Sequence, residues 1–296
     1  MKRRKATLFL ILWCCTVFSS SVYGADRPVV FVSVVPQKFF IQSIAEDLVD
    51  VQVMVRPGAN PATYEPKPSQ MAKLAGTALY FAIGVPFEKA WLGKISAVNP
   101  EMKIVSTDKN IKKMAMIEHH HGSSEENAGN IHHHGILDPH IWLSPPLVKE
   151  QAKVMLAALH DIMPDKKDIL EKNFKRFIAE LTDIDLELRR DFQDKQGLQF
   201  MVFHPSWGYF ARDYGLKQIA VELEGKSPKF AQLQELIHHA RENDIHILFV
   251  QPQFSTKKAK IIAREIHGKV EVADPLAEDW FDNLREVATK IKSAVK

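Results

Sequence analysis

Two short motifs, far apart in the chain, each present one imidazole beside a proline. They are Asp138-Pro139-His140 and Phe203-His204-Pro205. Neutral imidazole is the commonest side chain that binds zinc and related ions. A single histidine beside proline is more often structural, so the prediction rests on the two motifs together. They indicate a transition-metal site built around His140 and His204.

A third candidate ligand, Asp274, also precedes a proline. His204 directly follows the apolar run 200–203, and Asp274 follows the run 270–272. Each is therefore expected at the end of a strand. Open α/β sheets place their ligands outside the carboxyl ends of strands. His140 lies in a segment that leaves the first half of the chain. We therefore expect His140, His204 and Asp274 to converge in a cleft between two lobes.

Other histidines are concentrated in one polar stretch, residues 118–135. Six of the thirteen histidines form two triplets there, His119–His121 and His132–His134. A zinc buffer or an adhesin-like surface protein that uses this stretch instead of the cleft is therefore an alternative function.

A zinc hydrolase is a further alternative function, because three protein ligands leave one coordination position open. The chain has neither a His-Glu-x-x-His nor a Gly-x-Ser-x-Gly motif, so we predict that it is not an enzyme.

The N-terminus has the pattern of a cleavable signal peptide over residues 1–24. The basic segment Lys2–Lys5 is followed by an apolar stretch, 6–18, and then by small residues. This pattern predicts export to the periplasm. The two cysteines, Cys14 and Cys15, both fall within the signal. The mature chain is therefore expected to have no disulfide and no thiolate ligand.

Composition narrows the range of partners. The whole chain has 39 Lys and Arg against 36 Asp and Glu. Loss of the basic signal brings the mature protein close to neutrality, and we expect no nucleic-acid binding, which requires a concentrated basic face. The expected partners are a divalent metal ion and a membrane permease, and the protein is expected to be a monomer.

The remaining chain alternates between short β-rich runs and helical segments, on both sides of one long helical region. This order is typical of α/β lobes with parallel sheets. We predict an N-terminal βα lobe over 25–164, a linking helix over 165–195 and a C-terminal βα lobe over 196–296. Apolar residues spaced three to five apart place one buried stripe on the helix. These residues are Ile169, Phe174, Phe177, Leu181, Ile184 and Leu188.

Two local signals mark the expected ends of helices. Ser69 is predicted to be the N-cap of a short helix that runs through Ala75. Gly268 is predicted to be the C-cap glycine of a helix over Thr256–His267.

Together with further stretches, these motifs give the chain a family resemblance. The matching stretches are Arg56-Pro57-Gly58, Tyr64-Glu65-Pro66-Lys67-Pro68-Ser69, Asp138-Pro139-His140-Ile141-Trp142-Leu143-Ser144-Pro145, Phe203-His204-Pro205-Ser206-Trp207-Gly208-Tyr209-Phe210 and Asp274-Pro275-Leu276. The chain resembles, over nearly all its mature length, the metal-binding proteins of ABC importers for zinc and manganese. The resemblance implies two βα lobes joined by a rigid helix, with the cargo ion held between them and passed to an importer permease.

The resemblance also implies roles for individual residues. His140 and His204 match imidazole ligands, and Asp274 matches the carboxylate ligand. A histidine at the position of His204 is typical of zinc members, whereas manganese members have glutamate there. Zn²⁺ is therefore the expected cargo, with Mn²⁺ or Fe²⁺ as alternatives. Members of the zinc group also carry a histidine-rich loop like the one at 118–135.

One position departs from the family pattern. The family's first ligand is a histidine just after proline, and this chain has Ala62 at that place. Alanine cannot bind a metal ion. Water, Glu65 or a histidine from the polar stretch could complete the site, and the sequence leaves these alternatives open.

Overall fold

A computed structural model describes residues 27–116, 137–222, 228–254 and 256–294. The predicted signal peptide, 1–24, and the histidine-rich stretch, 118–135, lie outside these residues. In the part of the chain that is described, no helix is long and apolar enough to cross a membrane.

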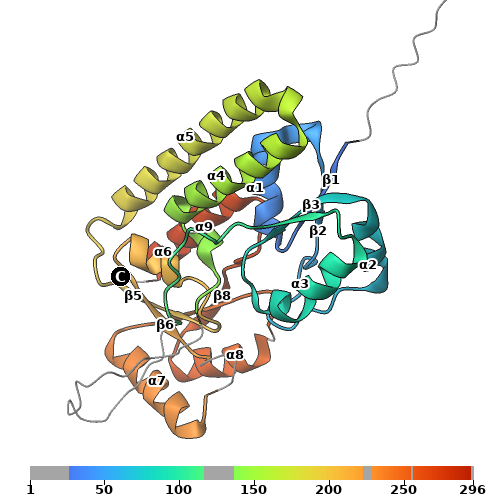
Figure 1. The fold of residues 1–296 in the computed structure, drawn as a ribbon. Helices are drawn as coiled ribbons and strands as arrows, with labels where there is room; N and C mark the ends of the chain where they lie inside the picture. The colour runs from blue at the N-terminus through green and yellow to red at the C-terminus, as the bar shows by residue number, and fades with distance from the viewer. Residues whose placement is uncertain (1–26, 117–136, 223–227, 255, 295–296) are drawn as a thin grey trace, which may run out of the picture.

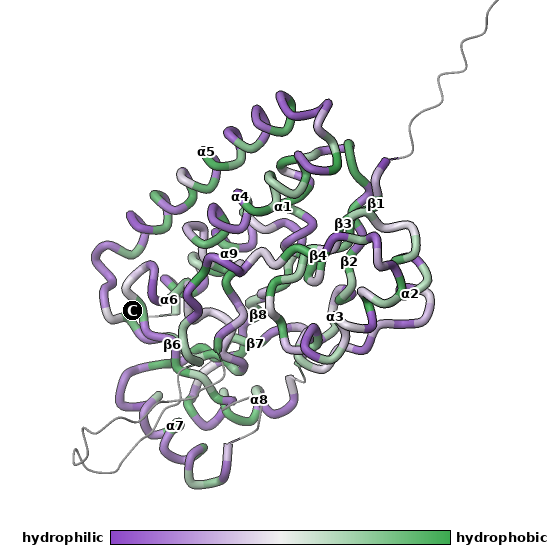
Figure 2. The backbone as a smooth tube through the Cα atoms, viewed as in Figure 1, coloured by the Kyte–Doolittle hydropathy of each residue, from purple (hydrophilic) through white to green (hydrophobic). Residues whose placement is uncertain are grey.

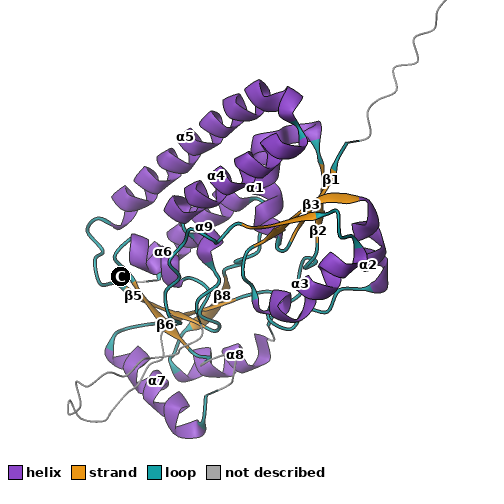
Figure 3. Cartoon of the chain, in the orientation of Figure 1, coloured by secondary structure: helices purple, strands orange, loops and turns teal. Residues whose placement is uncertain are grey.

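Two four-stranded parallel sheets form the framework (Figures 1 and 3). The first has the order β2-β1-β3-β4 and the second the order β6-β5-β7-β8. The strands are β1 (Val29–Val32), β2 (Asp50–Val53), β3 (Thr77–Ala82), β4 (Lys103–Ser106), β5 (Gln199–Val202), β6 (Lys217–Ala220), β7 (Ile247–Val250) and β8 (Lys269–Val272). The sheets thus share one topology, in which the first strand of each lobe pairs with the second and the third. The predicted α/β fold with two parallel-sheet lobes is confirmed.

The C-terminal sheet shows why its strands are so apolar. Phe200 and Val202 of β5 belong to a hydrophobic core that continues into the N-terminal lobe. Met201 and Phe203, which alternate with them, belong to a second core under α7 and α8. Successive side chains of a strand point to opposite faces, and both faces are covered by helices. A run of consecutive apolar residues is the result.

Helices cover both lobes (Figure 1). The helices of the N-terminal half are α1 (Val35–Ala45), α2 (Pro68–Lys73) and α3 (Pro86–Val98). The helices of the C-terminal half are α6 (Gly208–Asp213), α7 (Phe230–Glu242), α8 (Thr256–Glu265) and α9 (Trp280–Ser293). The sequence analysis did not predict α3. Its signals are Pro86 in the first turn and the buried residues Phe87 and Ile95.

One long helix, α5 (Lys167–Phe192), joins the lobes, as predicted. It runs side by side with α4 (Pro145–Ile162) along one edge of the molecule (Figure 1). The 26 residues of α5 span about 39 Å at 1.5 Å per residue. Figure 2 shows hydrophobic and hydrophilic residues alternating along α5, as an amphipathic helix requires.

The structure corrects the start of the predicted stripe on α5. Ile169 is 40% exposed, and Leu170 is buried in its place. From Phe177 onward the prediction agrees with the buried residues, which continue to Phe192. The first turn deviates because the helix begins at Lys167, after a short turn at Pro164–Lys166.

Two predicted helix ends also differ. Lys67, not Ser69, is the N-cap of α2, because Pro68 occupies the first turn and Gln70 Oε1 accepts the Lys67 backbone N–H at 3.1 Å. At the end of α8, His267 takes the left-handed conformation, with φ of 53°. Gly268 has a different role, since a Cβ atom there would lie 2.0 Å from the His246 carbonyl oxygen.

Tryptophans connect the lobes close to His140. Trp142 Nε1 donates to the Pro275 carbonyl at 2.6 Å, and Trp280 Nε1 donates to the Trp142 carbonyl at 2.8 Å. The Trp280 ring also packs edge-on against Phe40 of α1, with ring centroids 5.3 Å apart. The segment that carries His140 is therefore fixed to the C-terminal lobe by buried contacts.

Candidate metal centre

His140 is held by a buried carboxylate two residues earlier. Asp138 Oδ1 lies 2.7 Å from His140 Nδ1 and accepts the His140 backbone N–H at 2.9 Å. The carbonyl of Asp138 in turn accepts the Tyr209 hydroxyl at 3.0 Å. The same hydroxyl accepts the Met114 backbone N–H at 3.0 Å. These bonds fix the orientation of the His140 ring.

His204 has an equivalent arrangement in the C-terminal lobe. It follows β5, and its Nδ1 lies 2.8 Å from Glu222 Oε2. Gln251 holds the backbone, since its Nε2 donates to the His204 carbonyl at 2.7 Å. The ring stacks on Phe254, with centroids 4.8 Å apart and planes 23° apart. Position and orientation are thus both set by neighbours.

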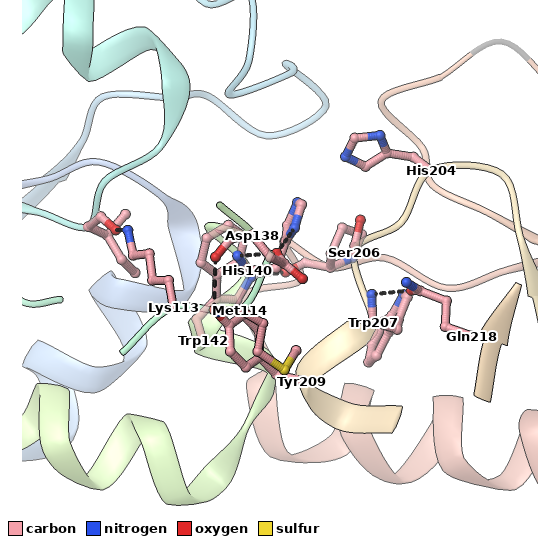
Figure 4. A network of polar contacts seen from close by, with 12 residues as sticks. Lys113, Met114, Asp138, His140, Trp142, His204, Ser206, Trp207, Tyr209 and Gln218 are labelled. Carbon is pink, nitrogen blue, oxygen red and sulfur yellow. Dashed lines mark hydrogen bonds and ion pairs between the residues drawn. The ribbon is translucent and has the colours of Figure 1, made fainter. Parts of the chain in front are cut away.

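The two rings meet across the space between the lobes (Figure 4). Their centroids are 5.4 Å apart and their planes form an angle of 74°. Because a carboxylate engages Nδ1 of each ring, Nε2 is the nitrogen left to bind a metal. A carboxylate behind a metal-binding histidine fixes its tautomer and makes it a stronger ligand. The free Nε2 atoms of the pair are therefore the candidate metal donors.

The environment of His204 favours its neutral, metal-binding form. Burial lowers the pKa of His204 below its usual value, and the nearby His140 lowers it further. The hydrogen bond that His204 donates to Glu222 opposes both effects but does not outweigh them. The ring therefore stays deprotonated to lower pH than an exposed histidine.

Both rings line a cavity of about 240 Å³, and Ala62 lines it as well. Ala62 belongs to a turn in which its backbone N–H donates to Asn60 Oδ1 at 2.8 Å. The position where the family pattern has a histidine therefore faces the same cavity as His140 and His204. Glu65, one of the suggested replacements, is exposed and is not among the residues that line the cavity.

Asp274 lies at the carboxyl end of β8, as expected, but its carboxylate is engaged elsewhere. Oδ1 accepts Gln253 Nε2 and the Leu276 backbone N–H, each at 2.9 Å. Pro275, Leu276 and Gln253 line the cavity, whereas Asp274 does not. In the described ranges, no group of three His, Cys, Asp or Glu residues is placed to hold a metal. The structure thus brings His140 and His204 together, and the role of Asp274 stays a prediction.

Two carboxylates behind the rings, those of Asp138 and Glu222, were not predicted from the sequence. Asp138 was part of a motif but received no role. Glu222 had a usable signal, because it comes just after β6, at the same edge of the sheet as His204. The rule that located His204 at a strand end would have located Glu222 as well.

Comparison with known proteins identifies the family. The family described as zinc-uptake complex component A, periplasmic (ZnuA) matches residues 30–294. The chain belongs to this family. The predicted resemblance is confirmed, and the family is a transport component and not a class of enzymes.

Relatives of the ZnuA family match along most of their length. The high-affinity zinc uptake system protein ZnuA of Bacillus subtilis is 30% identical over 284 residues, covering 92% of this chain and 86% of that protein. A crystal structure of a ZnuA deletion mutant with zinc bound has a TM-score of 0.82 at 43% identity, covering 91% of this chain and 98% of the other. A second ZnuA crystal structure has a TM-score of 0.83 at 42% identity, with 91% and 99% covered.

Proposed function

We propose that this protein captures Zn²⁺ between its lobes through His140 and His204 and delivers it to the permease of an ABC importer. The observation that carries the proposal is the facing pair of imidazoles, each backed by a buried carboxylate and both lining one cavity. Membership of the zinc-uptake family supports the delivery step. Asp274 is proposed as a further ligand, which would require its carboxylate to turn from Gln253 towards the cavity.

The donor set explains the choice of zinc. Imidazole nitrogen suits zinc better than manganese, whose usual partners are carboxylate and carbonyl oxygens. Two neutral imidazoles leave the charge of the ion uncompensated. The carboxylates of Asp138 and Glu222 lie directly behind the rings and supply the compensating negative charge.

Location and partner follow from the same role. We propose that residues 1–24 are removed on export and that the mature protein works in the periplasm as a monomer. The permease would then receive the ion from the side of the molecule where the lobes meet. The affinity for zinc must be high enough for capture and low enough for release to the permease.

A zinc titration tests the proposal. His140→Ala and His204→Ala should each weaken zinc binding by about tenfold or more, since removal of even a supporting partner of a metal ligand costs about 10- to 100-fold. The matched control is His238→Ala, because His238 is exposed and pairs only with Glu242 at 3.2 Å among the described residues. If both site variants bound zinc as tightly as the control, the proposed site would be wrong.

A further inference from the structure

The cavity between the lobes is larger than a bare ion needs. Its volume is about 240 Å³. A single water molecule needs only roughly 10–15 Å³ of cavity. Space of this size accommodates an ion together with a small organic molecule, although it falls below the range of about 300–1,000 Å³ that is typical of larger ligands.

The walls of the cavity resemble those of a small-molecule site. Most of them are apolar, including Pro61, Val85, Pro86, Trp142, Phe254 and Leu276. Besides the two histidines, three polar side chains interrupt them, Asn60, Ser206 and Gln253. Apolar walls with a few placed polar groups are typical of sites that bind organic ligands.

Gln253 adds a sign of an unmet interaction. Its Nε2 donates to Asp274 at 2.9 Å, but its Oε1 is buried and has no hydrogen-bond partner among the described residues. Buried acceptors are normally paired, so an unpaired one calls for an explanation. An N–H group of a molecule bound in the cavity would supply the missing donor after a small rotation of the amide.

The described residues place fewer donors around the cavity than zinc usually takes. Protein-bound zinc usually has four ligands in a tetrahedron. Among the described residues, the cavity offers two imidazole nitrogens, His140 Nε2 and His204 Nε2. Ala62 offers no donor, and Asp274, whose Oδ1 accepts from Gln253 and Leu276, does not line the cavity. While Asp274 keeps these bonds, two coordination positions are left for atoms from another source.

We propose that the protein takes zinc as a complex with a small chelator that offers at least two N or O donors, of which a free amino acid is the simplest. This inference rests on the proposed zinc capture by His140 and His204. The chelator's amine and carboxylate would occupy the two remaining positions, and its carbon skeleton would contact the apolar walls. The small side chain of Ala62 is what keeps this space open.

Equilibrium dialysis of the full-length mature protein with labelled L-histidine tests the proposal. With equimolar Zn²⁺, the protein should retain close to one labelled molecule per chain, and without Zn²⁺ it should retain almost none. Zinc bound through His140 and His204 with no retained label would overturn the chelator proposal. Zinc binding that is unaffected by His140→Ala, with or without L-histidine, would instead overturn the proposed function itself.

Variants at position 62 provide the matched controls. Ala62→His adds a third imidazole at the cavity wall, so this variant should bind Zn²⁺ alone at least tenfold more tightly. It should also retain at least tenfold less labelled L-histidine than the parent. Ala62→Phe fills the same space without a donor, so it should lose the retention without tightening zinc. Unchanged retention in both variants, with melting temperatures like that of the parent, would contradict the proposal. A further variant has all six histidines of the two triplets changed to alanine. If this variant no longer bound Zn²⁺ in the absence of a chelator, the chelator proposal would be contradicted as well.

Discussion

At the scale of single residues, the site depends on two imidazoles and on the carboxylates behind them. His140 and His204 were predicted as ligands from the sequence because each stands next to a proline, and His204 also follows a β-rich run. Glu222 could not be paired with His204 by the same means, since they are 18 positions apart and meet only across strands β5 and β6. Sequence patterns identify ligands more readily than the neighbours that orient them.

The carboxylate behind His204 should matter for affinity. Glu222→Gln keeps the shape of the side chain but removes the negative charge next to Nδ1, so zinc binding should weaken by roughly 10- to 100-fold. Competition with a chromophoric zinc chelator measures the change. Glu242→Gln, next to the exposed His238, is the control and should leave affinity unchanged. Equal affinities in the two variants would show that Glu222 has no orienting role.

Position 62 offers a gain-of-binding test in the absence of added chelators. Ala62→His should bind zinc at least tenfold more tightly, because it adds a nitrogen donor at the wall shared with His140 and His204. Calorimetry on protein lacking residues 118–135 excludes a contribution from the histidine triplets. No gain in affinity would mean that position 62 does not face the bound ion.

Acidification should act on the site in a defined direction. Protonated imidazole cannot bind zinc, so the affinity for zinc should fall as the pH is lowered from 7.5 to 5.

The stability of the metal-free protein should also depend on pH. The folded-state pKa of His204 lies below its ordinary value of 6.5. As the pH falls through about 6.5, the unfolded chain therefore takes up a proton before the folded one, and the metal-free protein loses stability. Thermal melts should show a smaller loss for His204→Gln than for the parent, and identical losses would contradict the assignment.

At the scale of elements, the strands and the long helices were predictable and some boundaries were not. Apolar runs such as Ile247–Val250 identify buried parallel strands, and the stripe on α5 has a helical period. Helix α3 was not predicted because it has few buried residues. Ser69 was wrongly predicted as the N-cap of α2, because Pro68 and Gln70 set the start of that helix. Competing signals from immediate neighbours decided the start of α2, and a residue-by-residue preference for Ser69 does not weigh them.

The contact between α6 and the segment before His140 gives a test at this scale. The Tyr209 hydroxyl bonds both the Asp138 carbonyl and the Met114 backbone N–H. Tyr209→Phe should lower the free energy of unfolding by about 1–3 kcal/mol, because one buried and one partly buried backbone group lose their partner. Tyr214→Phe, which removes a bond to Asp185 away from the cavity, is the control for zinc affinity. A Tyr209→Phe variant with unchanged stability and affinity would show that this contact does not position His140.

At the scale of the whole molecule, both candidate ligands contact the C-terminal lobe. His204 follows β5, and the His140 segment is tied to Pro275, Trp280 and Tyr209. From the N-terminal lobe, the turn at Ala62 lines the same cavity, together with Val85 and Pro86. The two-lobe architecture followed from the alternating pattern of the sequence. The division of ligands between lobes did not, because it depends on packing around the tryptophans.

Deletion of the histidine-rich stretch distinguishes a component of an importer from a zinc buffer. Deletion of residues 118–135 should leave the affinity of the cavity for zinc nearly unchanged, while reducing the total number of zinc ions bound. Calorimetric stoichiometry and affinity give both quantities. A buffer that uses the histidine triplets would instead lose nearly all binding.

Anomalous diffraction at the zinc edge, from crystals of the zinc-loaded mature protein, tests the central claim most directly. The account predicts a single strong peak in the cavity between the lobes, about 2.0–2.1 Å from Nε2 of both His140 and His204. A strong peak at other residues, with none between these two rings, would contradict it.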